Sequence, residues 1–305
     1  MFSFISPIKF TSFILFIISG FFVHFRGKVK YKPLRQLTDH STFMAPVNAL
    51  VYLFSKTPSS PYLNRRDFPE LDLFKENWHI IKEEAQHLLA DGGIKASAKR
   101  DDIGFNSFFK RGWKRYYLKW YAGNLPSAEQ TCPKTLELIS RVPSINAAMF
   151  TYLPAGSKLG LHRDPYAGSL RYHLGLITPN DDRCFIDVDG ERYSWRDGDD
   201  VVFDETYLHQ AENNTDIDRL IFFCDVARPM KSQIADRLNR FFGRYCMTAA
   251  AAQNVETDPI GLLNRAFKYI FMIHTSTRGL KRNYPRLHFC LKGLFFASLV
   301  YIVFF

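Results

Sequence analysis

The feature that most constrains the fold is a series of short, strand-like segments between residues 145 and 228. The segments are rich in β-branched and aromatic residues, and turns such as Pro-Asn-Asp-Asp and Asp-Gly-Asp separate them. Strands this short and this closely spaced are typical of a β-sandwich or a jelly roll. The predicted strands are 145–153, 170–178, 183–190, 191–199, 200–205 and 219–227.

Helices are predicted on both sides of these strands. Residues 69–91 have apolar residues at helical spacing, and a Gly-Gly pair follows them, which predicts one amphipathic helix. Shorter helices are predicted from about 133 to 141 and from about 231 to 243. The chain is therefore expected to be mainly β with flanking helices.

The N-terminal region contains an apolar run at 10–23. A membrane-spanning helix needs about 20 apolar residues, a length reached by counting from Phe2 and letting Lys9 extend toward the interface. No small-residue cleavage site follows the run, so an uncleaved membrane anchor is expected rather than a signal peptide.

Two further apolar runs accompany this anchor. Residues 291–305 are short for a full crossing, so the C-terminal membrane segment is expected either to span or to insert partway. Residues 43–54 contain Pro46 and are too short to span, which predicts an interfacial or re-entrant segment, or part of the core.

The net charge of +10 predicts a negatively charged partner, and basic residues flank the inner side of both terminal runs. Cytoplasmic flanks of membrane segments carry excess Lys and Arg, so the central region is expected in the cytoplasm, near anionic head groups. The flanking residues are Arg26, Lys28, Lys30, Lys32, Arg35, Arg278, Lys281, Arg282 and Arg286.

The 5 cysteines form no C-x-x-C pair, which fits a reducing compartment and gives no zinc signature.

The patterns described so far divide the chain into five segments. The predicted segments are a membrane anchor at 1–30, a basic or interfacial linker at 31–66, the catalytic β domain with its helices at 67–245, a basic connection at 246–286 and a C-terminal membrane segment at 287–305.

Residues 105–121 interleave aromatic residues with five basic ones, and their periodicity does not decide between helix and strand. Such a surface suits base stacking, a strand with a cationic outer face, or phosphates at a bilayer surface. The neighbouring membrane anchor favours the third interpretation and disfavours a nucleic-acid partner.

Residues 161–176 place two pairs of polar side chains two positions apart, His162 with Asp164 and Arg171 with His173. In a strand, residues i and i+2 point to the same side, so each pair is expected to share one space. With His209 downstream, His162 and Asp164 complete the two-histidine, one-carboxylate set that binds Fe(II) in non-haem oxygenases.

Arg219 follows on the last predicted strand, where a guanidinium can hold a dicarboxylate in bidentate fashion. An H-x-D pair alone is weak evidence, because it also occurs by chance. The H-x-D pair, a distal His and a later Arg in this order are a much more specific combination.

The sequence resembles a known family in two long stretches. They are YLPAGSKLGLHRDPYAGSLRYHLGL and YSWRDGDDVVFDETYLHQAENNTDIDRLIFFCDV, and they resemble the aspartyl/asparaginyl β-hydroxylase family of Fe(II)- and 2-oxoglutarate-dependent oxygenases. The wider chain is similar to the lipid A hydroxylase branch of Gram-negative bacteria. That similarity covers VHFRGKVKYKPLRQLTDHSTFMAPVNALVYLFS, GFNSFFKRGWKRYYLKWY and the apolar tail.

The resemblance implies a double-stranded β-helix, a cupin-like jelly roll, with terminal membrane helices. It implies Fe(II), 2-oxoglutarate and O2 as cofactor and cosubstrates. His162, Asp164 and His209 would be the catalytic metal ligands, and the remote carboxylate of 2-oxoglutarate would be held by Arg219, helped by Thr151, Arg171 and His173.

Other roles stay open for three of these residues. His173 also fits a hydrogen-bonded core histidine, and Arg171 fits a salt-bridge partner of nearby aspartates. Thr151 stands where the family often has serine and also fits an ordinary strand threonine.

The activity implied by the resemblance is hydroxylation of a fatty acyl chain of lipid A, or of its precursor in the bilayer, at the carbon next to the carbonyl. The enzyme would lie in the bacterial inner membrane with its catalytic domain facing the cytoplasm. Two alternatives remain: a hydroxylase of aspartyl or asparaginyl side chains in a protein, and a non-catalytic, membrane-tethered binding module.

Overall fold

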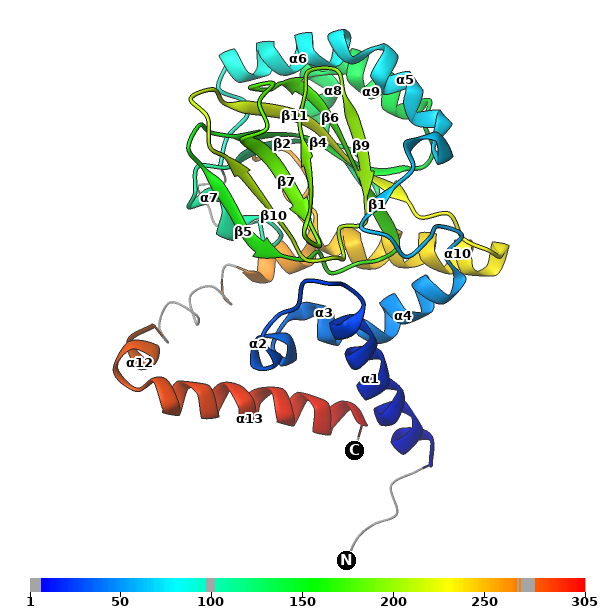
Figure 1. Cartoon of the computed structure of the whole chain (residues 1–305), viewed down its shortest axis with the longest axis vertical. Helices are drawn as coiled ribbons and strands as arrows, with labels where there is room; N and C mark the ends of the chain where they lie inside the picture. Colours follow the sequence, from blue (N-terminus) through cyan, green and yellow to red (C-terminus); the bar gives the residue numbers. More distant parts are fainter. Residues whose placement is uncertain (1–6, 97–101, 268, 270–277, 305) are drawn as a thin grey trace, which may run out of the picture.

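The computed structural model describes residues 7–96, 102–267, 269 and 278–304. Eight consecutive strands form two facing antiparallel sheets (Figure 1). They are β4 (Ile145–Leu153), β5 (Lys158–His162), β6 (Ser169–Ile177), β7 (Cys184–Val188), β8 (Glu191–Ser194), β9 (Asp200–Phe203), β10 (His209–Asn213) and β11 (Arg219–Ala227).

The strand order settles the choice between a sandwich and a jelly roll. One sheet has the order β9-β6-β11-β4 and the other β5-β10-β7-β8, so the chain passes repeatedly from one sheet to the other. This winding is the double-stranded β-helix, which confirms the predicted fold. Further strands extend the larger sheet at its edges: β1 (Tyr62–Leu63), β2 (Lys114–Trp120) and β3 (Gly123–Asn124).

The sequence pattern missed β5 and β10. Their segments, KLGLH and HQAEN, contain no β-branched residue and thus lack the usual strand signal. The predicted strand at 191–199 is shorter than expected and ends at Ser194, because the following Asp-Gly turn places Gly198 at a φ of 76°.

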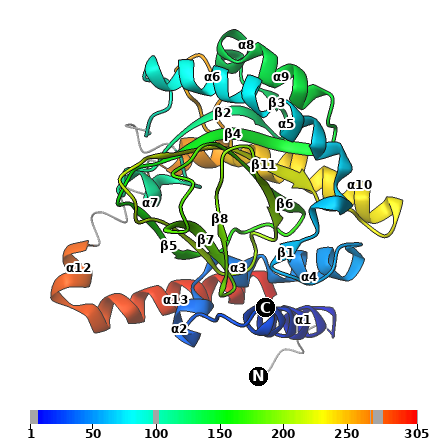
Figure 2. The ribbon, with the colours of Figure 1, turned by 45° about the horizontal axis from the view of Figure 1, so that its top comes forward.

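Helices cover the outer face of the larger sheet (Figure 2). The single helix predicted for 69–91 is wrong in one respect, because the segment is interrupted at Asn77. Asn77 has non-helical angles (φ −107°, ψ 20°), and its side chain donates a hydrogen bond to the Leu73 carbonyl at 2.8 Å. The elements are η2 (Pro69–Leu71), α5 (Asp72–Glu76), α6 (Trp78–Ala90), α8 (Pro126–Thr131) and α9 (Pro133–Ser140).

A core of apolar side chains joins these helices to the sheet. Phe74 of α5 and Ile81 of α6 are fully buried, and the Phe74 ring packs on the ring of Phe222 at 5.2 Å. The helix predicted near 133–141 is confirmed as α9, and the one near 231–243 as α10 (Gln233–Phe242).

The basic aromatic segment at 105–121 is part helix and part strand, as α7 (Asn106–Phe109) precedes β2. A cationic outer face is wrong for two of its basic residues. Arg115 is only 2% exposed and pairs with Asp102 at 2.9 Å, and Lys119 donates to the Ile145 carbonyl. Lys110 and Arg111 are exposed.

The N-terminal region is helical and lies outside the barrel. α1 (Pro7–Phe25, 19 residues) is the helix in the described ranges that is long and apolar enough to cross a membrane. It is followed by α2 (Pro33–Leu37), α3 (His40–Phe43) and α4 (Ala45–Phe54). Pro46 lies in the first turn of α4 and does not break it. The predicted anchor reaches its full length only when it is counted from Phe2, and residues 2–6 lie outside the described residues.

The C-terminal region continues from α10 through η3 (Gly243–Met247) and η4 (Thr248–Ala250). α12 (Arg278–Asn283) and α13 (Pro285–Phe304) follow, and α13 contains the apolar tail up to Phe304. The last residue, 305, lies outside the described residues. The C-terminal membrane segment and the five segment boundaries stay predictions.

Buried ion pairs fix the end of α1 to the barrel. Arg26 donates to Asp204 at 2.5 Å and to Thr206 at 2.7 Å. Arg228 also contacts Asp204, at 2.8 Å, and the Asp204 side chain is completely buried. Burial raises the pKa of Asp204, but Arg228 and Arg26 outweigh burial and hold this pKa below its usual value. The carboxylate is therefore ionised and joins the end of α1 to the barrel.

Backbone contacts continue this junction. Asp189 accepts hydrogen bonds from the N–H groups of Lys28 and Val29, at 2.9 and 2.8 Å. Gly27 permits this approach, because a Cβ there would lie 2.5 Å from Asp189 Oδ1. Arg163, which lies between His162 and Asp164, donates to the Val23 carbonyl at the end of α1.

Candidate active site

The barrel encloses a pocket with about 450 Å³ of empty volume between its two sheets. All seven predicted site residues line this pocket: Thr151, His162, Asp164, Arg171, His173, His209 and Arg219. The predicted site residues therefore share one pocket.

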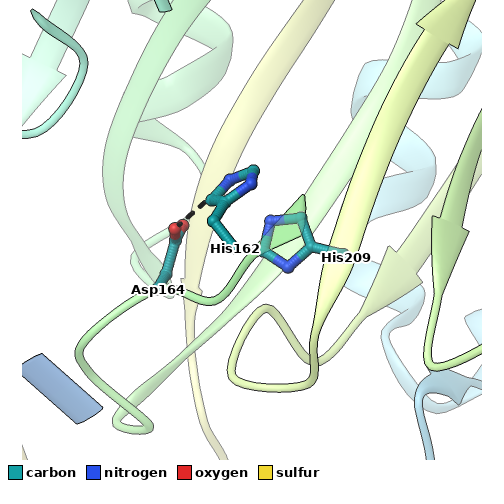
Figure 3. Close-up of side chains that lie close together, drawn as sticks. All are labelled: His162, Asp164 and His209. Carbon is teal, nitrogen blue, oxygen red and sulfur yellow. Dashed lines mark ion pairs between the residues drawn. The ribbon is translucent and has the colours of Figure 1, made fainter. Parts of the chain in front are cut away.

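His162, Asp164 and His209 form a compact group, with ligand atoms within 4.8 Å of one another (Figure 3). His162 ends β5 and lies opposite His209, the first residue of β10, in the sheet register. Asp164 lies in the loop after β5, not on the strand, so strand alternation is the wrong reason for its placement beside His162. The loop backbone instead fixes it, because Asp164 N–H donates to the Glu205 carbonyl at 2.9 Å.

The hydrogen bonds of the two histidines define their tautomers. Nδ1 of His162 lies 2.8 Å from the Gly160 carbonyl, and Nδ1 of His209 lies 2.9 Å from the Tyr207 carbonyl. A carbonyl oxygen only accepts, so each Nδ1 carries the proton and each Nε2 keeps a free lone pair. This is the form in which imidazole binds a metal ion.

Burial keeps both imidazoles neutral. Burial lowers the pKa of His162, and burial together with the neighbouring His162 lowers the pKa of His209 to about 3. The ring centroids of the two histidines lie 4.2 Å apart, and two imidazolium ions at this distance would repel each other.

Asp164 supplies the negative charge of the group. Burial raises its pKa, but the charge and the hydrogen bond of Arg171 hold the pKa below the usual value, so the carboxylate is ionised. Its Oδ2 accepts a hydrogen bond from Arg171 at 2.7 Å, and its Oδ1 lies 3.9 Å from His162 Nε2. Two neutral imidazoles and one carboxylate fit a divalent metal such as Fe(II).

Arg171, on β6, is surrounded by carboxylates. Besides Asp164, it contacts Asp225 at 3.0 Å and forms an ion pair with Glu205. Its donors therefore point at protein carboxylates, which favours the salt-bridge alternative over direct contact with a cosubstrate. The sequence analysis missed Asp225 and Glu205. The pairing of Arg171 with Asp225 follows from the β6–β11 register, which the sequence does not reveal.

Arg219, at the start of β11, has the opposite environment. It is 2% exposed, no carboxylate among the described residues pairs with it, and its Nε has no hydrogen-bond partner there. Its guanidinium lies 4.3 Å from the centre of the Trp195 ring. Burial lowers its pKa to about 10, so the group stays charged at neutral pH. A buried, unpaired cation is costly, and its presence in a pocket indicates an anionic ligand.

His173 and Thr151 line the same pocket as Arg219, on strands β6 and β4 that flank β11, where they lie opposite Phe223 and Ile221. Neither ring nitrogen of His173 has a hydrogen-bond partner in the described part of the chain. This is not the hydrogen-bonded core histidine of the alternative interpretation. Burial lowers the pKa of His173 well below its usual value, so the ring is neutral.

Aromatic side chains form another wall of the pocket. Phe105, Phe108 and Trp113 line it, and the Phe108 ring meets the His162 ring at 4.7 Å. The sequence analysis assigned this segment to a surface contact, whereas three of its aromatic residues face the site. Contacts between β5 and the segment that precedes β2 decide this placement. The local sequence pattern does not reveal these contacts.

Comparisons with known proteins agree with this geometry. The family model described as Aspartyl/Asparaginyl beta-hydroxylase matches residues 75–229, a range that includes all seven site residues. The ornithine lipid ester-linked acyl 2-hydroxylase of Rhizobium tropici is 37% identical over 194 residues, which cover 63% of this chain and 69% of that protein.

More distant relatives match between half and two thirds of the chain at lower identity. The human aspartyl/asparaginyl beta-hydroxylase is 27% identical over 161 residues, which cover 51% of this chain and 20% of the human protein. A solved prolyl-4-hydroxylase from Pseudomonas putida is 16% identical, with a TM-score of 0.34, and the match covers 61% of this chain and 99% of that one. The family match and the Rhizobium relative show that the chain belongs to the aspartyl/asparaginyl β-hydroxylase family, a family of hydroxylase enzymes.

Proposed function

We propose that this protein is an Fe(II)- and 2-oxoglutarate-dependent hydroxylase of a membrane lipid, acting on the carbon next to an acyl carbonyl, with lipid A or its precursor as substrate. The observation that carries the proposal is one pocket with two opposed sets of groups. Free metal-binding atoms of His162, Asp164 and His209 lie on one side, and the buried, unpaired Arg219 lies on the other.

His162, Asp164 and His209 would hold the iron. When bound, Fe(II) with 2-oxoglutarate and O2 supplies the oxidising chemistry. The protein's own contribution is to keep the ligands ready: the Gly160 and Tyr207 carbonyls fix the two imidazole tautomers, and Arg171 keeps Asp164 ionised and oriented.

Arg219 would bind the remote carboxylate of 2-oxoglutarate, since a guanidinium matches a carboxylate in shape and charge. His173 and Thr151 line the same pocket and would add further contacts to the cosubstrate. The Trp195 ring under Arg219 excludes water from that contact, which strengthens the ion pair.

Two observations support an acyl chain as the group that is oxidised. The wall beside His162 is aromatic, with Phe105, Phe108 and Trp113, and suits an apolar chain. The apolar helix α1 ends at the loop that carries the metal ligands, which brings the site to a bilayer. A lipid with several acyl chains does not leave the bilayer, so its enzyme must lie against it.

The head group of the substrate distinguishes two candidates. The basic flanks of the chain suit the phosphates of lipid A. The Rhizobium relative, whose name states an ornithine lipid as substrate, favours an ornithine lipid as a second candidate.

Mass spectrometry of lipids tests the proposal in cells with the gene, without it, and with His162→Ala. We expect one added oxygen on an acyl chain of lipid A, dependent on the gene and absent in the variant. If only an ornithine lipid gains the oxygen, the substrate is an ornithine lipid and not lipid A. If a protein is hydroxylated and the lipids are unchanged, the enzyme is a protein hydroxylase and the proposed activity is wrong.

A spectroscopic measurement separates the enzyme from a binding module. Anaerobic addition of Fe(II) and 2-oxoglutarate to the purified chain is expected to give a weak visible charge-transfer band that His162→Ala lacks. A normally folded protein without that band would favour the non-catalytic alternative.

A further inference from the structure

Helix α10 carries an uncovered apolar stripe on the outside of the barrel. Ile234, Leu238 and Phe241 are 72%, 64% and 61% exposed, and Tyr245 just beyond the helix is 60% exposed. Their spacing of four, three and four residues places all of them on one helical face. The stripe is therefore one continuous surface.

The other faces of α10 are clearly distinct from this stripe. Ala235 and Asn239 face the barrel, where the Asn239 amide donates to the Gly168 carbonyl at 2.9 Å. Ser232 caps the helix by accepting the Ala235 N–H at 3.2 Å. The third face is polar and exposed, with Gln233, Arg237 and Arg240. The helix is thus held firmly in place while its apolar face stays outside the protein.

The position of α10 indicates what covers this face. α10 packs on α4, where Ala235, Val51 and Met230 form one apolar cluster. α4 in turn packs on α1, and Phe22 of α1 contacts Tyr52 of α4 with ring centroids 5.9 Å apart. Figure 1 shows α1, α4 and α10 together along the lower side of the barrel.

α4 shows the same outward exposure as α10. Its Leu50 and Leu53 are 61% and 63% exposed, although Asn48 and Val51 on its other face are buried. Exposed apolar residues are therefore present on α1, α4 and α10, three helices that pack one against the next. Patches of this kind mark contacts with membranes or partners, and a helix with one apolar and one basic face is typical of the membrane interface.

We propose that α10 lies in the plane of the bilayer interface, with Ile234, Leu238, Phe241 and Tyr245 among the lipid acyl chains. With α4, it forms a second membrane contact that fixes the tilt of the barrel about α1. Arg237, Arg240 and Arg244 flank the stripe and suit the phosphates of anionic lipids. This contact does not depend on the proposed activity.

Spin labelling of the full chain tests the contact. Cys246→Ser and Cys290→Ser remove the exposed thiols, and the other three cysteines are buried and do not react. A nitroxide is attached at Leu238→Cys, or at Gln233→Cys on the polar face as the matched control. Both proteins are reconstituted in vesicles of phosphatidylethanolamine and phosphatidylglycerol.

The collision rates of the label with oxygen and with a water-soluble nickel complex are then measured. We expect a several-fold higher oxygen-to-nickel ratio at Leu238 than at Gln233, since oxygen concentrates in the bilayer and nickel stays in water. Equal ratios at the two positions would overturn the proposal. So would dipolar broadening at Leu238 that disappears on dilution with unlabelled chains, because a second copy would then cover the stripe.

Discussion

Arg171 and Arg219 have the same side chain and lie in the same pocket, but their surroundings are opposite. Arg171 meets three carboxylates, Asp164, Glu205 and Asp225, whereas no carboxylate among the described residues pairs with Arg219. A neutralised arginine positions its partners, and an unpaired one attracts an anion. The two residues therefore have separate roles that can be measured separately.

For Arg219→Ala, we expect weaker binding of 2-oxoglutarate with little change in metal binding. A hydrogen bond to a charged group is worth about 1.5–3 kcal/mol, so the Kd should rise by roughly 10- to 150-fold. Anaerobic titration at saturating metal measures it. Arg196→Ala, which removes an ion pair with the exposed Asp182, is the control and should leave the Kd unchanged. An unchanged Kd in Arg219→Ala would contradict the carboxylate-binding role.

For Arg171→Gln, we expect weaker metal binding, because Asp164 loses the donor that orients it and keeps it ionised. Loss of such an outer partner typically weakens metal affinity about 10- to 100-fold. Titration with Co(II) measures the affinity, and Arg183→Gln, at an exposed ion pair, serves as control. If the Co(II) affinity is unchanged and the Kd of 2-oxoglutarate rises, Arg171 binds the cosubstrate directly.

At the scale of elements, the junction between α1 and the barrel joins distant parts of the sequence. Arg26 follows the membrane helix, Asp204 follows β9, and Arg228 follows β11, yet the three side chains meet in one buried group. Residues 161–167, the end of β5 and the loop after it, contain His162 and Asp164 and bond to Asn48 of the same N-terminal region. Helix α1 and the candidate site are therefore joined through the same segment.

Stability should decrease in acid through Asp204. The folded pKa of Asp204 lies below its unfolded value of about 3.9, so its contribution is complete above that pH and is lost as the pH falls further. Asp204→Asn should cost about 3–5 kcal/mol at neutral pH, because it leaves buried arginines without their partner. Below about pH 4, a further decrease in pH should lower the unfolding temperature of Asp204→Asn less than that of the unmodified protein.

Thermal unfolding in detergent, followed by circular dichroism, checks this prediction. Asp216→Asn, at an exposed aspartate, is the matched control and should behave as the unmodified protein. If Asp204→Asn has the same unfolding temperature at neutral pH as the control, the ion pairs do not hold the junction.

At the scale of the whole molecule, helices α1, α4 and α13, which contain the apolar runs, lie on one side of the barrel and helices α5, α6, α8 and α9 on another (Figure 1). The basic flank after α1 predicts that the barrel faces the cytoplasm. In this predicted orientation, the proposed site would reach a lipid that stays in the bilayer.

A cysteine at Glu76, an exposed residue at the end of α5, tests the orientation. In a chain that also carries Cys246→Ser and Cys290→Ser, an impermeant maleimide should label Glu76→Cys only after spheroplasts are permeabilised. The parent chain without Glu76→Cys should stay unlabelled, since its three remaining cysteines are buried. Labelling of intact spheroplasts would place the barrel on the other side of the membrane.

The sequence by itself determined the strand-rich domain, its flanking helices and the residues of the candidate site. Six strands followed from β-branched and aromatic runs between turn residues, and the H-x-D pair, the distal His209 and Arg219 identified the chemistry. These signals are local, because each depends on residue type and short spacing. The helix break at Asn77 was missed, since it depends on one side chain bonding to the backbone.

Only the tertiary structure decided how the site residues divide their roles. The β5–β10 register brings His162 opposite His209, and the β6–β11 register brings Asp225 to Arg171 and leaves Arg219 free. The uncovered stripe of α10 likewise depends on which faces the barrel and α4 occupy. Strand pairing and packing between layers bring together residues that are far apart in the chain. Whether an arginine is paired or unpaired depends on those distant neighbours and not on its own sequence context.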